Sequence, residues 1–246
     1  TENGAYGIYP VQTTNVLLEG NVAIAASDAG IYVGQSKQVV VRDNRAEYNV
    51  AGIEVENTIG ADVYNNIANN NTGGILVFNM PSIPQRGYAT RVFDNEIHSN
   101  NTENFAIPGT AVSGVPAGSG VVINSNDQVE VFNNHFSNNN TANIVIPSYF
   151  SANFAGQRGL AAEFDPYPEE ILIYDNTFEG GGTQPGLNYL TELKNALYGE
   201  QGAFPDIIWD GIVNPENKDQ RAIICVDNGE AESVSYTHLR AHETTS

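Results

Sequence analysis

A repeat of 22 or 23 residues constrains the fold of this chain more than any other feature of its sequence. Gly7, Gly30, Gly52 and Gly74 are 23, 22 and 22 residues apart, and each opens a short apolar strand. One apolar position of this strand recurs six times along the chain, at Ile8, Ile31, Ile53, Ile75, Val121 and Ile144. A unit of this length cannot bury an apolar face alone, so the repeats must stack on one another.

A second strand repeats in step with the first and ends in asparagine. This asparagine recurs seven times, at Asn21, Asn44, Asn66, Asn95, Asn134, Asn176 and Asn228. Five residues later most units carry another turn asparagine, at Asn49, Asn71, Asn100 and Asn139. Three short strands and tight turns in each unit predict an all-β, single-stranded, parallel β-helix of about seven coils over residues 1–232. Crossovers between parallel strands are right-handed in nearly all proteins, so we expect a right-handed solenoid.

Alternation within the first strand separates inward from outward side chains. Ile53 and Val55 face the core in this pattern, and Glu54 and Glu56 face outward. The same pattern places Tyr9 and Tyr32 outward one coil apart. In the last unit it places Cys225 inward, stacked on Ile173 as a core thiol.

Insertions interrupt the repeat at residues 80–89, 103–118, 147–169 and 177–220. The last one contains an apolar spacing that predicts a short amphipathic helix from Leu187 to Tyr198, ended by Gly199. Insertions in a solenoid usually wall a groove or cover an open end, and we expect this helix to be a cap or cover.

The charge of the chain excludes several classes of function. There are 29 acidic and 10 basic residues, which gives a formal net charge of -19. A surface this negative repels nucleic acid and anionic lipid, whose binding depends on basic groups. No apolar run approaches the roughly 20 residues of a membrane span, and a single cysteine cannot form an internal disulfide.

Both ends of the chain look incomplete or foreign. The chain starts at Thr1 inside the patterned region, so we expect a fragment whose upstream coils and export signal are missing. From Val234 to Thr244 the sequence resembles a translated sequencing adapter. We therefore expect residues 233–246 to be an artefactual, disordered tail.

The repeats resemble those of right-handed parallel β-helix proteins that bind or hydrolyse carbohydrate. More narrowly, the segments from Ser27 to Gly34 and from Glu47 to Glu54 resemble an uncharacterised bacterial family of β-helix proteins. That resemblance implies an exported protein, in the periplasm or outside the cell. It also implies a c-type cytochrome-like companion as a partner.

The segment Tyr6-Gly7-Ile8-Tyr9-Pro10-Val11 is similar to a motif of alginate C5-epimerases, Tyr-Gly-x-Asp-Pro-His. In those enzymes the Asp and the His point from the first strand into the groove. Here Gly7 and Pro10 match, whereas Tyr9 and Val11 stand at the Asp and His positions. Epimerase chemistry through this motif is disfavoured, because Val11 cannot transfer a proton.

The outward face of the first sheet carries the candidate site residues. Tyr9 and Tyr32 are candidate sugar-stacking platforms. Asp28, in the turn just before Gly30, is a candidate binding residue of the same cluster, and an Asx turn is its alternative role. Glu54 and Glu56, roughly 6.5 to 7 Å apart along the strand, are weak candidates for an acid and base pair or for ligands of Ca²⁺. Solvated residues on a sheet face are the alternative. We assign no metal site.

Two classes of function remain open. The first is a non-catalytic module of the cell envelope that binds a glycan or a partner protein. The second is a polysaccharide-processing enzyme, a lyase, epimerase or hydrolase, with Glu54 and Glu56 in the groove of the first sheet and Arg86 from the insertion as a charge partner. The shortage of basic residues weakens the lyase and epimerase versions, because those reactions must stabilise an enolate beside a uronate carboxylate.

Overall fold

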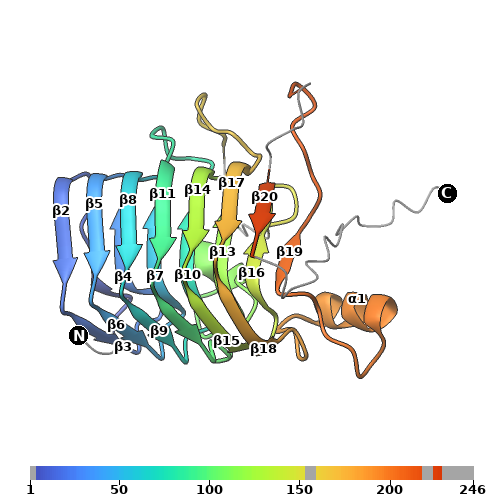
Figure 1. The fold of residues 1–246 in the computed structure, drawn as a ribbon. Coiled ribbons are helices and arrows are strands. Elements are labelled where there is room, and N and C mark those ends of the chain that lie inside the picture. Colours follow the sequence, from blue (N-terminus) through green and yellow to red (C-terminus); the bar gives the residue numbers. More distant parts are fainter. Residues whose placement is uncertain (1–3, 153–158, 218–223, 229–246) are drawn as a thin grey trace.

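The fold consists of three parallel sheets that wrap around one axis, as seen in a computed structural model that describes residues 4–152, 159–217 and 224–228 (Figure 1). The first sheet contains β1 (Tyr6–Ile8), β4 (Ala29–Gly34), β7 (Ala51–Glu56), β10 (Gly73–Phe78), β13 (Ser119–Asn124), β16 (Ala142–Ile146) and β19 (Ile207–Trp209). The second contains β2 (Thr14–Glu19), β5 (Lys37–Arg42), β8 (Ile59–Tyr64), β11 (Tyr88–Phe93), β14 (Asp127–Phe132), β17 (Glu169–Tyr174) and β20 (Ile224–Asp227). The third contains β3 (Val22–Ile24), β6 (Arg45–Glu47), β9 (Ile67–Asn69), β12 (Glu96–His98), β15 (His135–Asn139) and β18 (Thr177–Gly181).

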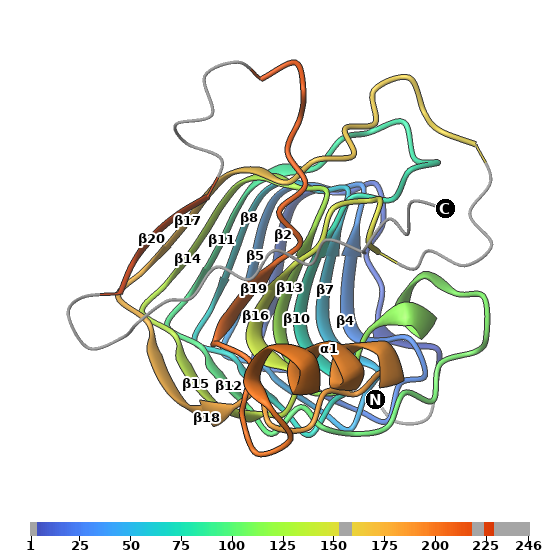
Figure 2. The ribbon, with the colours of Figure 1, turned by 90° about the vertical axis from the view of Figure 1, so that its right-hand side faces the viewer.

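Each strand pairs in parallel with its equivalent one coil away, which confirms the predicted parallel β-helix of about seven coils. The view along the axis from the C-terminal end shows the three sheets enclosing the interior (Figure 2). Short strands of like residues therefore lie over one another along the axis, so every coil depends on its neighbours for burial.

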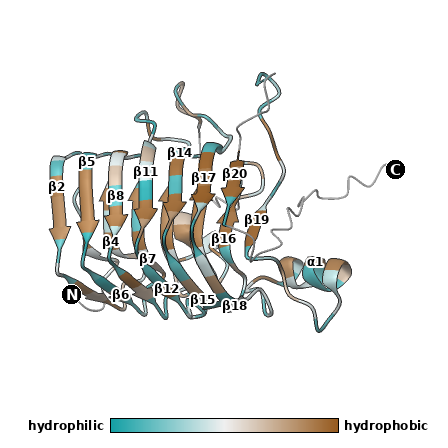
Figure 3. Cartoon of the chain, in the orientation of Figure 1, coloured by the Kyte–Doolittle hydropathy of each residue, from teal (hydrophilic) through white to brown (hydrophobic). Residues whose placement is uncertain are grey.

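The core fills the interior with stacked aliphatic side chains from all three sheets. Ile31, Ile53 and Ile75 form the predicted inward ladder of the first sheet and are fully buried. Val41 and Val63 face them from the second sheet, and the third sheet contributes a smaller row that includes Ala46 and Ala68. Apolar residues concentrate in the strands and hydrophilic residues in the turns (Figure 3). Burial of this continuous row is the main force that holds the coils together.

Every described turn from the second sheet to the third has the same two-residue form. A residue with positive φ comes first and the predicted asparagine follows it. The first residue is one that tolerates this left-handed conformation, namely Gly20, Asp43, Asn65, Asp94, Asn133 or Asp175. The choice of residue at the first position thus closes the turn, and none of these six turns adds or loses a residue.

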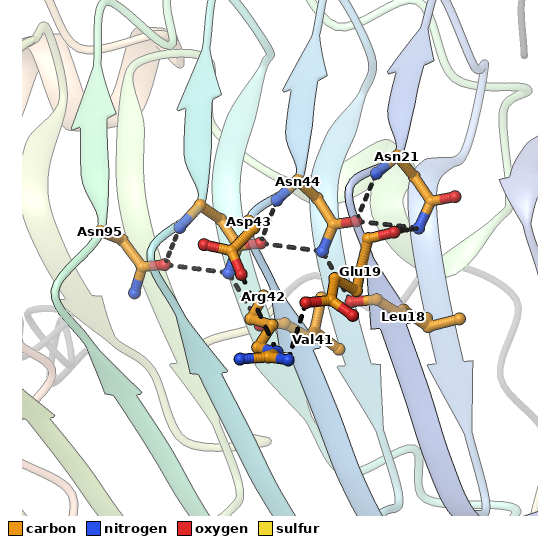
Figure 4. Close-up of polar contacts among 9 residues, drawn as sticks. Leu18, Glu19, Asn21, Val41, Arg42, Asp43, Asn44 and Asn95 are labelled. Carbon is orange, nitrogen blue, oxygen red and sulfur yellow. Dashed lines mark hydrogen bonds and ion pairs between the residues drawn. The ribbon is translucent and has the colours of Figure 1, made fainter.

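The second residue of each turn builds a ladder of hydrogen bonds along the axis. The Oδ1 of Asn66 accepts hydrogen bonds from the backbone N of Asn44 at 3.0 Å and from its Nδ2 at 2.9 Å. The Nδ2 of Asn66 donates to the carbonyl oxygen of Val41 at 2.9 Å. Figure 4 shows the ladder from Asn21 to Asn95. The same pattern continues to Asn228, which confirms the predicted line of stacked asparagines.

A second ladder lies at the turn from the third sheet to the first. The Oδ1 of Asn71 accepts from the backbone N of Asn49 and from its Nδ2, both at 2.9 Å, and Asn100 and Asn139 continue the line. The recurring glycine of the first strand makes room for it. A Cβ at Gly52 would lie 2.8 Å from the Nδ2 of Asn71, closer than van der Waals contact permits. The glycine repeat and the asparagine repeat are therefore two parts of one packing arrangement.

All the long insertions lie at the two borders of the first sheet. Residues 79–87, 147–168 and 210–223 separate it from the second sheet, and residues 99–118 and 182–206 separate the third sheet from it. The predicted excursion at 177–220 is partly wrong, because β18 and β19 lie within it. β19 has only three residues, against five or six in most strands of the first sheet, and β18 directly follows the turn asparagine Asn176, as the other strands of the third sheet follow theirs.

The predicted helix is confirmed as α1 (Asn188–Tyr198), with Gly199 at its C-terminal cap. Leu190 packs with Phe204 against Ala142 and Ile208, which belong to β16 and β19. The helix thus covers part of the outward face of the first sheet near the C-terminal end of the solenoid (Figure 2).

The prediction that Cys225 faces the core is wrong. Cys225 is exposed and pairs in register with Leu172, while Val226 pairs with Ile173. The reason is the last turn. Asp175 occupies the positive-φ position between Tyr174 and Asn176, whereas Asp227 pairs with Tyr174 and is followed at once by Asn228. One residue fewer before the asparagine shifts the register, and a shift of one residue exchanges the two faces of a strand.

Residues 233–246, expected to be an artefactual tail, lie outside the described residues. In the part of the chain that the structure describes, no helix combines the length and the apolar character needed to cross a membrane.

We predict that Asn66→Ala strongly destabilises the solenoid. The side chain is buried, and its loss leaves the backbone N–H of Asn44 and the carbonyl of Val41 without their partners. The expected loss is about 2 to 4 kcal/mol of unfolding free energy, measured by urea denaturation. Asn195→Ala, which removes an exposed amide from α1, is the matched control and should change stability by less than about 0.5 kcal/mol. Equal effects of the two substitutions would contradict a stabilising ladder.

Candidate functional site

The outward face of the first three coils carries a compact group of aromatic and acidic side chains. We call it the tyrosine–carboxylate cluster, and it consists of Tyr6, Tyr9, Tyr32, Asp28, Glu54 and Glu56. Its members come from β1 and the residues after it, from β4 and the turn before it, and from β7. Three of the five predicted binding or catalytic residues of the first three coils meet through direct contacts, because Tyr9 stacks on Tyr32 and Tyr32 bonds to Glu56.

The register of the first sheet sets the positions of these side chains. Glu54 lies directly beside Tyr32 of the preceding coil and Leu76 of the following coil. Ile53 and Val55, on either side of Glu54, belong to the core. The predicted outward orientation of Glu54 and Glu56 therefore follows from the strand alternation.

The three tyrosine rings pack against one another. The ring centroids of Tyr9 and Tyr32 are 4.6 Å apart in a stacked arrangement, and those of Tyr6 and Tyr9 are 4.3 Å apart. Tyr6 also contacts Tyr32, at 5.2 Å between centroids. Tyr9 is the most accessible ring, with 52% of its surface exposed, whereas Tyr32 is only 4% exposed. Solvent therefore meets the cluster at Tyr9.

Two of the tyrosines are fixed by hydrogen bonds to carboxylates. The hydroxyl of Tyr32 donates to Oε1 of Glu56 at 2.7 Å, and the hydroxyl of Tyr6 donates to Oδ2 of Asp28 at 3.0 Å. Gly34 allows the first bond, because a Cβ at that position would collide with the Tyr32 ring. Asp28 is thus bonded to a tyrosine of the cluster.

The carboxyl groups of the cluster hold their protons more tightly than usual. Burial raises the pKa of Glu54 well above its ordinary range, and the neighbouring Glu56 and Asp28 raise it further. Burial raises the pKa of Glu56 to about 7, although the hydrogen bond from Tyr32 lowers it. Burial also raises the pKa of Asp28, against a lowering effect of its bond from Tyr6. An uncharged carboxyl is favoured wherever water is excluded.

The acidic pair is covered, which differs from the expectation of solvated residues or an open groove floor. Glu54 is 1% exposed and Glu56 is 8% exposed. The insertion at 99–118 contributes to this cover through the 3₁₀ helix η1 (Ala111–Gly114) and the residue after it. Val112 and Val115 pack in one apolar cluster with Tyr32 and with Leu76, the neighbour of Glu54 in the ladder.

One oxygen of Glu54 has no hydrogen-bond partner. Its Oε2 is buried, and it receives no hydrogen bond from the residues that the structure describes. An unpartnered buried oxygen typically costs about 1 to 3 kcal/mol. Among the described residues it is the one buried carboxyl oxygen without a hydrogen-bond partner, which makes it a candidate for contact with a ligand.

Arg86, the predicted charge partner, lies elsewhere. It forms ion pairs with Asp127 of β14 and, at 3.1 Å, with Asp165. Arg86 and Asp127 border a hollow of about 360 Å³, whose other lining residues are Tyr88, Gln128, Glu169 and Glu170. None of its lining residues belongs to the tyrosine–carboxylate cluster. The insertion at 79–87 instead packs at the turn that follows Glu56, where Asn57 Nδ2 donates to the carbonyl of Gln85.

No group of three or more His, Cys, Asp or Glu side chains among the described residues is arranged to hold a metal ion. The chemistry of the cluster is that of proton-bearing carboxyl groups beside aromatic rings. Such a cluster can bind hydrogen-bonding or cationic ligands, and its acids can transfer protons near neutral pH.

Sequence reasoning did not identify Tyr6 as a member of the cluster. Strict alternation would place it inward with Ile8, but it pairs with Ala29, and both residues pack on the outward face. Ala29 and Ala51, which precede the recurring glycine in the next two coils, also pack in this outward cluster, so the alternation does not extend past that glycine to the first residue of the strand. Tyr6 lies one repeat before Asp28 and Ala29 in the sequence, and this spacing was the signal that could have placed it in the cluster.

Comparisons with known proteins agree on the fold. The family model described as right-handed beta helix region matches residues 1–157. No curated protein matches the chain significantly.

Three solved structures are similar. The A-modules of the mannuronan C-5 epimerases AlgE4 and AlgE6 from Azotobacter vinelandii share 13% and 14% identity with this chain, with TM-scores of 0.46 and 0.42. Those matches cover 95% and 96% of this chain but only 60% and 58% of the modules. An alginate lyase from Paenibacillus sp. str. FPU-7 shares 9% identity with a TM-score of 0.35, over 85% of this chain and 78% of the lyase.

We predict that Glu56→Gln stabilises the protein at high pH and not at low pH. The native state favours the protonated acid, so wild-type stability falls as pH rises from the ordinary carboxyl pKa toward about 7. At pH 8 the variant should gain on the order of 2 to 3 kcal/mol over wild type, and at pH 4 the gain should vanish. Denaturation series across this range measure the difference. Glu96→Gln, an exposed change of the same charge, should show no such trend, and a pH-independent gain for Glu56→Gln would rule out the proposed cause.

Proposed function

Because this chain belongs to the right-handed β-helix proteins, we propose that it is a non-catalytic glycan-binding module whose contact surface is the tyrosine–carboxylate cluster. The fold alone does not define a ligand, so the proposal depends on the residues of the site. The observation that carries it is the half-exposed ring of Tyr9, supported from behind by two other tyrosines.

The packing of Tyr9 suits it to hold a sugar. An aromatic ring with one exposed face gives a flat apolar surface for the C–H groups of a pyranose, and its neighbours limit the entropy lost on binding. The Tyr9 ring packs on Tyr6 and Tyr32, whose hydroxyls bond to Asp28 and Glu56. Burial raises the pKa of Tyr9, and Glu56, Asp28 and Glu54 raise it further. Hydrogen-bonding groups therefore surround the edge of the platform, as is typical of ligand sites with an apolar base and a few polar contacts.

Burial of the acids favours binding over catalysis. A catalytic acid must reach the glycosidic oxygen, which lies between two sugar rings, and Glu54 is almost completely covered, so only a small group on the edge of a ring can approach it. The overall charge of -19 also disfavours the uronate substrates of lyases and epimerases. These two facts support a module that contacts its glycan mainly through Tyr9.

We predict that Tyr9→Ala weakens glycan binding roughly fivefold or more, because a lost aromatic contact costs on the order of 1 kcal/mol. An array of neutral, amino and acidic oligosaccharides would identify a ligand, and isothermal titration calorimetry would then compare the variant with wild type. Tyr189→Ala removes a comparably exposed tyrosine from α1 and should leave affinity unchanged. Wild-type protein that binds no oligosaccharide of the array would overturn the proposal.

The second candidate function is a polysaccharide-processing enzyme, favoured by one observation. The two acids have raised pKa values, one of about 7, and paired carboxyls of this kind supply the acid and base of glycoside hydrolysis. This version requires the cover formed by the 99–118 insertion to open.

Glu54→Gln separates the two functions. We predict that an enzyme would lose turnover by at least a hundredfold, whereas a binding module would release no reducing ends before or after the change. A reducing-end assay on the oligosaccharides that bind measures this. Turnover by wild type that Glu54→Gln abolishes would replace the binding proposal with the enzymatic one.

The proposal includes a location outside the cytoplasm and a c-type cytochrome-like companion as a possible protein partner on the same face. Both rest on the resemblance of the repeats to an exported bacterial family. Fractionation of the source cells would test the location, and recovery only in the cytoplasmic fraction would reject it. Co-purification from the periplasmic fraction would test the companion.

A further inference from the structure

We propose that the sugar recognised by this site carries an ammonium group, and that the unpartnered oxygen of Glu54 is the acceptor that selects it. The ligand class is thus an amino-sugar oligomer with free amines. This inference rests on the proposed glycan-binding function and narrows it to one substrate class.

The first support is the charge of the site. Asp28, Glu54 and Glu56 lie around one tyrosine, and none of the ion pairs between described residues involves any of the three. By contrast, acids on the second and third sheets have basic partners, such as Glu19 with Arg42 at 2.7 Å and Glu47 with Arg45 at 2.7 Å. Acids grouped without a protein cation favour a ligand that brings the cation.

The second support is the hydrogen-bonding capacity of the three acids. The tyrosine hydroxyls already donate to Asp28 and Glu56, whereas Oε2 of Glu54 receives nothing although it is buried. A primary ammonium has three donors and no acceptor, so it satisfies this atom and adds charge. A charge-assisted bond of this kind is roughly twice as strong as one between neutral groups.

The third support is the position of Tyr9, which offers a way in. No hydrogen bond to a described residue holds the Tyr9 hydroxyl, and its ring follows β1 without belonging to the strand. A small shift of the Tyr9 ring therefore breaks no hydrogen bond and opens a path along its edge, while the ring keeps its place over Tyr6 and Tyr32, which Asp28 and Glu56 hold fixed. A cation that enters beside these rings also gains from the negative faces of the aromatic systems.

A uronate or a neutral sugar fits the same position less well. A carboxylate ligand would meet three acids with no basic group to receive it. A neutral hydroxyl could donate to Glu54, but it brings no positive charge and so gains nothing from ionisation of the acids. The expected order of affinity is therefore amino sugar, then N-acetylated or neutral sugar, then uronate.

Isothermal titration calorimetry with β-1,4-linked glucosamine hexamer, N-acetylglucosamine hexamer and mannuronate hexamer at pH 6.5 tests the order. We expect the glucosamine hexamer to bind at least tenfold more tightly than its N-acetylated form, and the mannuronate hexamer not to bind. Measured in two buffers of different ionisation enthalpy, binding of the amine should release protons, because the acids must ionise to pair with it. Glu54→Gln should reduce both the preference and the proton release, whereas Glu96→Gln should change neither.

The outcomes separate this inference from the function on which it rests. Equal binding of the two glucosamine forms, or a preference for mannuronate, would overturn the inference and leave glycan binding in place. A lysine hexapeptide that binds as tightly as the amino sugar would also overturn it, because the site would then recognise a cation without its sugar. If none of the three sugars binds and the oligosaccharide array is also blank, the proposed function fails together with the inference.

Discussion

The fold depends on a turn of two residues that is repeated without change from coil to coil. A residue in the left-handed conformation reverses the chain, and the following asparagine bonds to the coils on both sides. Because the backbone groups of the turn are satisfied by the ladder, the turn can be buried at no cost in unpaired polar groups. The ladder also fixes the register, and the register decides which side chains enter the core and which face outward.

The tyrosine–carboxylate cluster differs from the rest of the molecule in how its buried polar groups are satisfied. The asparagine ladders satisfy their buried amides as far as the last coil, where Asn228 Nδ2 lacks a partner among the described residues. The cluster, by contrast, buries Glu54 and Glu56, partly buries Asp28 and leaves one carboxyl oxygen unpartnered. Such an arrangement lowers stability, since each ionised acid must give up its hydration. Sites that bind or react with ligands often lower the stability of a protein in this way, because their polar groups are held in place for a partner.

Much of the fold could be predicted from the sequence because the repeat is exact in the places that matter. The asparagine spacing identifies the coil, and alternation identifies the outward position of Glu54 and Tyr32. Burial of the site could not be predicted, because it depends on where the 99–118 insertion folds back, and an insertion has no repeat to define its register. The orientation of Cys225 was predicted wrongly for a related reason. One missing turn residue moves the inward side chains of a strand to its outward face without altering the apolar pattern of the strand.

The insertions are confined to two of the three connections between the sheets. The connection from the second sheet to the third has a constant length, and the other two connections vary in length. Turns between the second and third sheets hold two residues in every described coil, while both borders of the first sheet accept loops of many lengths. Segments inserted at these borders reach the outward face of the first sheet. Val112 of the 99–118 insertion and Leu190 of the 182–206 insertion both pack on that face. The ligand specificity of such a solenoid can therefore change when these loops are lengthened or replaced, without a compensating change in the stacked coils. For the same reason, grafting new loops at residues 79–87 or 99–118 is the natural route to altered recognition on this scaffold.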